Sequence, residues 1–157
     1  MIPTVYIETT IVSYLVSKPS RDLIIAAHQQ LTQTWWQERL QHFDTFVSPI
    51  VLDEISKGDQ DAAKARLNAV RNIKILEATQ EVFELGEHYY KRLKIPNSAK
   101  PDAYHLAIAT WHGMDFMVTW NCSHLANGKI KRYLEDLNDE RGFRTPIICT
   151  PEELLEG

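Results

Sequence analysis

The sequence predicts an α/β protein in which one central parallel sheet carries helices on both faces. Short apolar runs alternate along the chain with longer segments whose apolar residues recur at helical spacing. This alternation is typical of parallel sheets, because parallel neighbours must be joined by a crossover, usually a helix. The alternation is not interrupted by an internal repeat or by a linker rich in Pro, Gly or Ser, so residues 1–157 are expected to form a single domain.

Five apolar runs are expected to form the strands of the sheet. Each run is short and is bounded by residues that favour turns or helix starts. The predicted strands are Thr4–Ile7, Thr45–Ser48, Ile73–Leu76, Phe116–Thr119 and Pro146–Cys149. A helical bundle is the weaker alternative, because the runs VYI and DFMVTW are too short for core helices.

Seven further segments are predicted to be helical. The first begins after Ser20 or Asp22, either of which can cap it, and reaches Gln41. Pro49 opens the second, and Gly58 ends it. The remaining five are predicted over residues 60–72, 80–93, 101–113, 130–138 and 151–156.

Composition narrows the classes of protein to which the chain can belong. Its apolar content of 44% and charged content of 24% are ordinary for a globular domain. No membrane association is expected, and without the pattern of a secretory signal the expected location is the cytoplasm. Cys122 and Cys149 are expected to be free and buried, outside any zinc-binding cluster. The net charge of −4 argues against binding nucleic acid through overall charge.

Four polar residues are expected near one edge of the predicted sheet. Glu8 follows the first strand and Asn121 the fourth, while Glu54 and Asp102 lie on helices beside that edge. Ligands of open parallel sheets bind beyond the carboxyl ends of the strands. Taken singly, each residue also suits an ordinary role, such as an acid at a helix start, a turn or cap residue, or a solvated helix position.

The combination of these residues predicts a cation site. Glu54 shares the apolar face of Val51, three residues earlier, whereas Asp53 is expected to face solvent. Carboxylates that point inward at one edge repel one another unless protons or cations neutralise them. Oxygen-rich sites of this kind suit Mg²⁺ or Mn²⁺. We therefore expect Glu8, Glu54 and Asp102 to meet where a divalent cation can bind.

Three blocks of the sequence resemble the PIN-domain family, in particular the VapC-like toxin ribonucleases of bacterial type II toxin–antitoxin systems. The blocks are VYIETTIVSYLV, FVSPIVLDEISKGD and KPDAYHLAIATWHGMDFMVTWNCSHLAN, and they follow the family's order of elements over nearly the whole chain. The last block is the most specific, with an acid opening an Ala-rich helix, then Gly, an apolar strand and Thr-Trp-Asn. The resemblance implies a three-layer α/β/α sandwich and metal-dependent cleavage of single-stranded RNA.

The resemblance also implies roles for individual residues. Glu8, Glu54 and Asp102 would be the acidic metal-site residues, with Mg²⁺ or Mn²⁺ as the cofactor, and Asn121 would occupy the fourth acidic position. The family most often has Asp at positions 8 and 121, so this chain moves one carboxylate outward and loses the charge of another. Thr9 and Thr119 would be supporting polar groups, and they belong to the residues expected to contact RNA: Thr9, Thr119, His105, Lys129, Lys131 and Arg132.

Several of these assignments have alternatives. His105 is expected to contact either a substrate phosphate or a site carboxylate, which would raise its basicity, and the alternative for His105 and His124 is a histidine packed on a helix flank. For the basic residues the alternative is a solvated helix end. The expected partners are an RNA substrate and an antitoxin protein, with a homodimer as the usual state of the family. The neighbours Trp35 and Trp36 cannot both face one core, so at least one is expected at an interface.

Two other functions stay open. One is a PIN-like domain with weakened catalysis that binds RNA or a protein partner, which Asn121 favours. The other is a different α/β enzyme acting on a small phosphorylated substrate. It is less favoured because the chain has no Gly-rich phosphate-binding loop.

Overall fold

Five parallel strands form the central sheet of the computed structural model, which describes residues 1–156. The strands are β1 (Thr4–Ile7), β2 (Asp44–Val47), β3 (Lys74–Ile75), β4 (Phe116–Val118) and β5 (Ile147–Cys149). Their order is β3-β2-β1-β4-β5, and every neighbouring pair is parallel. Each strand agrees with its predicted segment to within one residue at either end.

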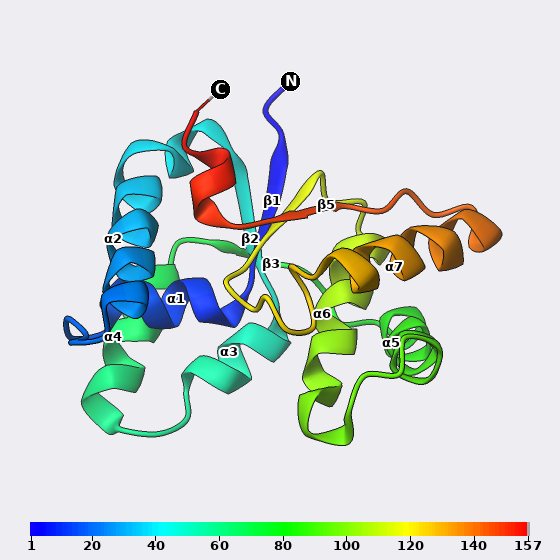
Figure 1. Ribbon diagram of the computed structural model, residues 1–157, viewed down its shortest axis with the longest axis horizontal. Coiled ribbons are helices and arrows are strands. Elements are labelled where there is room, and N and C mark those ends of the chain that lie inside the picture. Colours follow the sequence, from blue (N-terminus) through cyan, green and yellow to red (C-terminus); the bar gives the residue numbers. More distant parts are fainter. Residues whose placement is uncertain (157) are drawn as a thin grey trace.

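Helices cover both faces of the sheet. The α-helices of the described residues are α1 (Thr9–Val16), α2 (Leu23–Glu38), α3 (Pro49–Ile55), α4 (Gln60–Val70), α5 (Gln80–Arg92), α6 (Lys100–Trp111) and α7 (Gly128–Arg141). Short 3-10 helices cover Leu40–His42, Asn97–Ala99 and Pro151–Leu154. Figure 1 shows α1–α4 on one side of the sheet and α5–α7 on the other. The predicted three-layer α/β/α sandwich is confirmed.

Two helix predictions were incomplete. Helix α1 is missing from the predicted segments, because TTIVSYLV is rich in β-branched residues with modest helix propensity. Burial of Ile11 and Val12 in the core stabilises it as a helix nevertheless. The predicted helix at residues 151–156 is only a short 3-10 helix. For α2 the cap is Asp22, whose side chain accepts hydrogen bonds from the backbone N–H groups of residues 24 and 25.

The order of the strands has a reversal beside β1. The chain places β2 and then β3 progressively outward from β1, and returns through α5 and α6 to place β4 on the other side of β1. Ligands of doubly wound sheets bind at the carboxyl ends of the strands that flank such a reversal. The residues that follow β1 and β4 are therefore the best placed to form a site.

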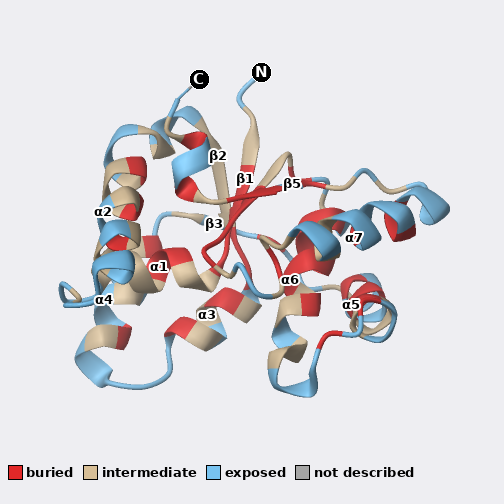
Figure 2. Ribbon diagram, viewed as in Figure 1, coloured by how far each residue is buried: buried red, intermediate tan, exposed pale blue. Residues whose placement is uncertain are grey.

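Buried residues lie mainly in β1, β4 and β5 and on the faces of the helices that turn toward the sheet (Figure 2), whereas both residues of β3 are exposed. Helix α6 is the most deeply buried, since every residue from His105 to Thr110 is buried. Its neighbour α5 packs closely against it, and a Cβ atom at Gly86 would lie only 2.3 Å from Cδ1 of Tyr104. The absence of a side chain at position 86 is thus what lets the Tyr104 ring lie against α5.

Two minor predictions need correction. Trp35 is fully buried, and Trp36 is half-buried with its ring packed edge-on to Trp35 and against the core. The pair therefore gives no evidence for an interface, because α2 turns both rings toward the protein. Both cysteines are free, as predicted, but only Cys149 is buried and Cys122 is exposed. No helix within residues 1–156 combines the length and the apolar character needed to cross a membrane.

The close packing of α5 on α6 can be tested with Gly86→Ala. The added methyl group must displace the Tyr104 ring, so we expect the free energy of unfolding to fall by about 1–3 kcal/mol. Gly128→Ala is the matched control, because a Cβ atom there would meet nothing within 4 Å. Urea denaturation compares the variants with the parent, and equal stability of the two variants would contradict the packing.

Candidate functional site

The register of β1 and β4 brings Glu8 and Thr119 side by side. Ile7 lies opposite Val118, and the backbone N–H of Glu8 donates to the carbonyl of Val118 at 3.1 Å. The hydroxyl of Thr119 donates to Glu8 Oε1 at 2.6 Å. Glu8 is only 3% exposed and Thr119 is fully buried. The carboxylate that follows the first strand is thus held inside the molecule, at the reversal of strand order.

Glu8 also caps helix α1. Its Oε1 accepts hydrogen bonds from the backbone N–H of Thr10 at 3.1 Å and from the Thr10 hydroxyl at 2.5 Å. Ser, Thr, Asp and Asn are the usual caps, so a glutamate here is uncommon. Within residues 1–156 all of these bonds use Oε1 and none uses Oε2. One oxygen is therefore fixed by the fold, and the other can bind a cation or water.

Helix α3 places Glu54 against α6. Glu54 Oε1 accepts a hydrogen bond from the Thr9 hydroxyl at 2.6 Å and lies 2.6 Å from Nε2 of His105. His105 is fully buried, and its Nδ1 lies 2.6 Å from the hydroxyl of Tyr6. Asp53, by contrast, is exposed. The prediction that Glu54 faces inward and Asp53 faces solvent is confirmed.

Asp102, in the first turn of α6, is held by the segment that follows β4. Its Oδ2 accepts a hydrogen bond from Asn121 Nδ2 at 3.0 Å and lies 3.3 Å from His124 Nδ1. At its other end, Asn121 Oδ1 accepts from the backbone N–H of His124 at 3.1 Å. An aspartate at position 121 could not donate to Asp102 and would instead repel it. Asn121 therefore positions Asp102 through a hydrogen bond, in addition to removing an acidic group from position 121.

The three carboxylates share His105 as a common neighbour. Burial lowers the pKa of His105, but the hydrogen bond to Glu54 and the charges of Glu8, Glu54 and Asp102 together raise it above its usual 6.5. Burial raises the pKa of Glu54, but His105 and Thr9 outweigh this effect and hold it below its usual 4.5. The His105–Glu54 pair is thus stabilised in its ionised form, and the imidazolium offsets one of the three negative charges.

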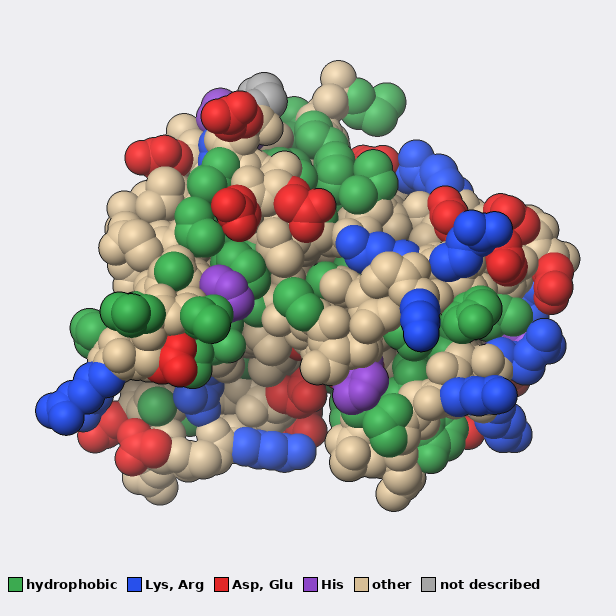
Figure 3. Space-filling model, viewed as in Figure 1, with side chains coloured by type: hydrophobic (Ala, Val, Ile, Leu, Met, Phe, Trp, Pro, Cys, Tyr) green, Lys and Arg blue, Asp and Glu red, His purple; other side chains and the backbone are tan. Residues whose placement is uncertain are grey.

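Asp102 keeps a raised pKa despite its partners. Burial is the main cause, and the charge of Glu54 adds a smaller effect. The hydrogen bond from Asn121 and the two histidines oppose the shift, but the pKa of Asp102 stays above its usual 3.8. A bound cation would stabilise the ionised form of this buried carboxyl. Figure 3 shows acidic side chains beside the hollow between the two helix layers, at the lower centre of the view.

The site offers the kind of ligand that Mg²⁺ and Mn²⁺ prefer, because some of its carboxylate oxygens accept no hydrogen bond from the described residues. In the described part of the chain, however, no three His, Cys, Asp or Glu side chains are arranged to hold one metal ion together. Mg²⁺ usually keeps several waters and is held by one or two carboxylates. The arrangement thus suits an ion held by one or two of the acids with its water shell, and not one ligated by all three.

Two residues predicted to contact RNA have a different role. His105 and Thr119 are fully buried, and their side chains bond to Glu54 and Glu8 respectively. For His105 the predicted contact with a site carboxylate is confirmed, and only the predicted contact with a substrate is wrong, because the residue has no exposed surface. Thr119 is the supporting polar group that the resemblance implies, and it too has no surface for a substrate. Thr9 is half-buried and donates to Glu54, so it supports a carboxylate as the resemblance implies.

The basic residues lie at the start of α7. Lys129 and Arg132 are exposed, and Lys131 is half-buried beside a hollow of about 290 Å³ that Glu135 and Glu153 also line. Among residues 1–156, none of the ion pairs involves the three basic residues. No contact joins them to the carboxylates, so their role toward RNA stays a prediction.

Residues that the sequence did not single out complete the site. The Tyr6 hydroxyl bonds to both His105 and Ser48. The Thr10 hydroxyl donates to Glu8 and accepts from the backbone N–H of Trp120 at 2.9 Å. Tyr6 resembles an ordinary core aromatic in an apolar strand, and Ser48 resembles an ordinary helix cap before Pro49. The only sequence signal for Tyr6 and Ser48 is that each carries a hydroxyl, and both residues prove to be fully buried.

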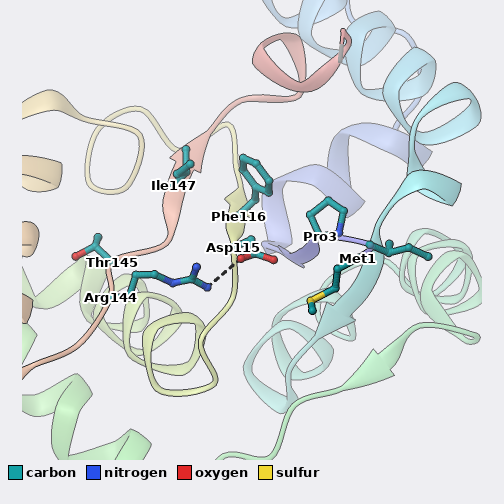
Figure 4. A pocket seen from close by; sticks show the side chains of 8 residues that line it. Met1, Pro3, Asp115, Phe116, Arg144, Thr145 and Ile147 are labelled. Carbon is teal, nitrogen blue, oxygen red and sulfur yellow. Dashed lines mark hydrogen bonds and ion pairs between the residues drawn. The ribbon is translucent and has the colours of Figure 1, made fainter.

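A second concave region lies at the opposite edge of the sheet (Figure 4). This pocket of about 440 Å³ is lined by Met1, Ile2, Pro3, Asp115, Phe116, Arg144, Thr145 and Ile147. These residues belong to the amino ends of β1, β4 and β5, and the Arg144–Asp115 ion pair of 2.9 Å crosses them. The lining is mostly apolar and contains none of the predicted site residues. The carboxyl edge of the sheet therefore remains the candidate site.

Comparison with known protein families finds no family model that matches the chain, and no curated protein matches it either. The resemblance to PIN domains accordingly stays a prediction.

The His105–Glu54 pair makes stability depend on pH. Glu54→Gln is expected to lower the pKa of His105, because burial then acts with less opposition. The folded pKa of His105 is raised and that of Glu54 is lowered, so the pair's stabilisation is complete between about pH 4.5 and 6.5. It is lost above this window as His105 deprotonates and below it as Glu54 is protonated.

Urea denaturation with EDTA present measures this effect as the difference in unfolding free energy between the parent and Glu54→Gln. NMR titration of the imidazole measures the pKa of His105. Asp53→Asn is the control, since Asp53 is exposed and pairs only with Lys57 at 3.0 Å. A His105 pKa that stays the same in Glu54→Gln would show that the pair is not coupled.

Proposed function

We propose that the chain is a metal-dependent endoribonuclease that hydrolyses phosphodiester bonds of single-stranded RNA. The observation that carries the proposal is that Glu8, Glu54 and Asp102, from three distant segments, all lie close enough to the buried His105 for their charges to raise its pKa. Burial also leaves the pKa of Asp102 raised, so a bound cation would stabilise its ionised form. Such a site attracts a hard divalent cation, and a cation is what joins an acidic protein to a phosphate.

The cofactor would be Mg²⁺ or Mn²⁺, with Asp102 and Glu8 as the direct ligands. When bound, the cation lowers the pKa of a water molecule and screens the charge of the phosphate. Glu54 has its Oε1 fixed by Thr9 and His105, which leaves Oε2 to accept a hydrogen bond from water. Because the pKa of Glu54 is lowered, its carboxylate suits orienting the attacking water better than removing its proton.

Asn121 would set the strength of the activity. It donates a hydrogen bond to Asp102 and brings no charge, so the site holds three acids instead of four. A smaller negative charge weakens cation binding. Asn121 thus also supports a second candidate function, an RNA- or partner-binding module with weakened catalysis.

The biological setting is part of the proposal and rests on the resemblance alone. The chain would act in the cytoplasm as the toxin of a toxin–antitoxin pair, with an antitoxin protein as its partner and a homodimer as its state. Lys129, Lys131 and Arg132 would guide the RNA backbone by charge, in a way that depends on salt concentration.

The proposed activity predicts cation-dependent cleavage. Purified parent protein should cut mixed single-stranded RNA with Mg²⁺ or Mn²⁺ and should not cut it with EDTA. Asp102→Asn and Glu8→Gln should both abolish cutting, because each removes a carboxylate that would bind the cation. Asp53→Asn, which changes an exposed acid one residue from Glu54, should keep the parent's rate.

Electrophoresis of the RNA products measures cleavage, and a filter-binding assay with EDTA measures RNA affinity. Cleavage that survives EDTA would exclude the proposed function. RNA binding without cleavage would favour the second candidate function.

Asn121→Asp should lower the stability of the metal-free protein and raise its affinity for a cation. Without metal the variant loses the hydrogen bond to Asp102 and gains a like charge, so the free energy of unfolding should fall by about 1–3 kcal/mol. With Mn²⁺ its melting temperature should rise more than that of the parent. Asn127→Asp is the matched control, because Asn127 caps α7 and aspartate caps equally well. Thermal melts that respond to Mn²⁺ to the same extent in both variants would contradict the placement of Asn121 in the site.

A further inference from the structure

A row of buried hydrogen-bonding side chains runs from the sheet to Glu54. Ser48 Oγ lies 2.7 Å from the Tyr6 hydroxyl, which lies 2.6 Å from His105 Nδ1. On the other side of the imidazole ring, Nε2 lies 2.6 Å from Glu54 Oε1. Ser48, Tyr6 and His105 are all fully buried, whereas the Glu54 side chain is 29% exposed. Glu54 is therefore the end of the row that solvent can reach.

The members of the row are fixed by three rigid elements. Ser48 caps α3, since its Oγ accepts from the backbone N–H of Val51 at 3.2 Å. Tyr6 belongs to β1, between β2 and β4, and His105 lies in the buried part of α6. Glu54 lies on α3, the helix that Ser48 caps. The row therefore begins at the start of α3, continues through side chains of β1 and α6, and ends on α3. Rotation of any of these side chains would break a hydrogen bond.

The chemistry of the row gives the imidazole one orientation. A carboxylate only accepts hydrogen bonds, so the Nε2 that faces Glu54 must carry a hydrogen. The Tyr6 hydroxyl can either donate to Nδ1 or accept from it, so the row is satisfied whether or not Nδ1 is protonated. Histidines that bond to a functional group are often oriented in this way by a partner on the other ring nitrogen.

Stability alone does not require such a row. Buried polar groups stabilise a fold little more than apolar side chains of the same shape, and they destabilise it when one partner is missing. A row of three fully buried polar residues that ends on a half-exposed carboxylate is better explained by the need to fix that carboxylate. A carboxylate misplaced by about 1 Å can cost an enzyme about 100-fold in rate.

We propose that Ser48, Tyr6 and His105 form a positioning relay that holds the Glu54 carboxylate in one orientation at the edge of the sheet. None of the three touches substrate, and each acts through Glu54. The kinetic consequence of this inference rests on the proposed nuclease function, whereas the coupling of Tyr6 to His105 does not.

The coupling is tested with Tyr6→Phe, which removes one hydroxyl and keeps the ring in the core. Tyr89→Phe is the matched control, because Tyr89 is also fully buried and donates its hydroxyl hydrogen to Asn138, on α7. Both variants should melt at a lower temperature than the parent. Only Tyr6→Phe should change the ¹⁵N NMR shifts of both imidazole nitrogens of His105, including Nε2, which Tyr6 does not touch. Unchanged Nε2 shifts in Tyr6→Phe would overturn the relay.

The kinetic consequence is tested with a double-mutant cycle on RNA cleavage. Tyr6→Phe should lower kcat by about 10- to 100-fold with little change in KM, whereas Tyr89→Phe should keep the parent's kcat. In a Glu54→Gln background Tyr6→Phe should have no further effect, because the residue it acts through is gone. An equal loss of kcat in both backgrounds would show that Tyr6 acts in some other way, and the relay would be rejected.

If the parent protein cuts no RNA, the proposed nuclease function fails by itself. The relay is then decided by the His105 nitrogen shifts alone, since these need neither metal nor substrate. Failure of the relay and failure of the nuclease proposal therefore give different results.

Discussion

The burial of negative charge beside His105 is the constraint on which the rest of the site depends. Carboxylates stay ionised inside a protein only if positive charge or hydrogen-bond donors stabilise them. His105 provides the charge, and the side chains of Thr9, Thr10, Thr119 and Asn121 provide donors. Asp102 nevertheless keeps a raised pKa, chiefly through burial, and the proposed cation would stabilise its ionised form.

The fold brings these groups together through the order of its strands. Because β4 returns beside β1, Thr119 comes next to Glu8, although 111 residues separate the two. The same arrangement puts the start of α6 beside the end of α3, which is how Asp102 and Glu54 come to share one histidine. Residues of the site also stabilise the fold, since Glu8 caps α1 and Ser48 caps α3.

Asn121 is the residue on which the two candidate functions differ. Its amide accepts from the backbone at one end and donates to Asp102 at the other, so it stabilises the metal-free protein. The amide is neutral, however, and adds no charge that would attract a cation. A site of this kind suits a nuclease whose affinity for metal is low, and it equally suits a binding module in which the acids are held by the protein alone.

The sequence by itself determined the strands, six of the seven α-helices of the described residues and the edge at which the polar residues gather. Strand ends agree to within one residue, and the inward position of Glu54 follows from helical spacing, because both depend on neighbours a few residues apart. The tertiary structure alone decided which groups bond to which carboxylate. That Ser48 and His105 both bond to the Tyr6 hydroxyl, and that Asn121 donates to Asp102, depends on side chains between 19 and 99 residues apart. No local pattern reports such contacts, because they form only when the register of β1 and β4 and the packing of α3 on α6 are both in place.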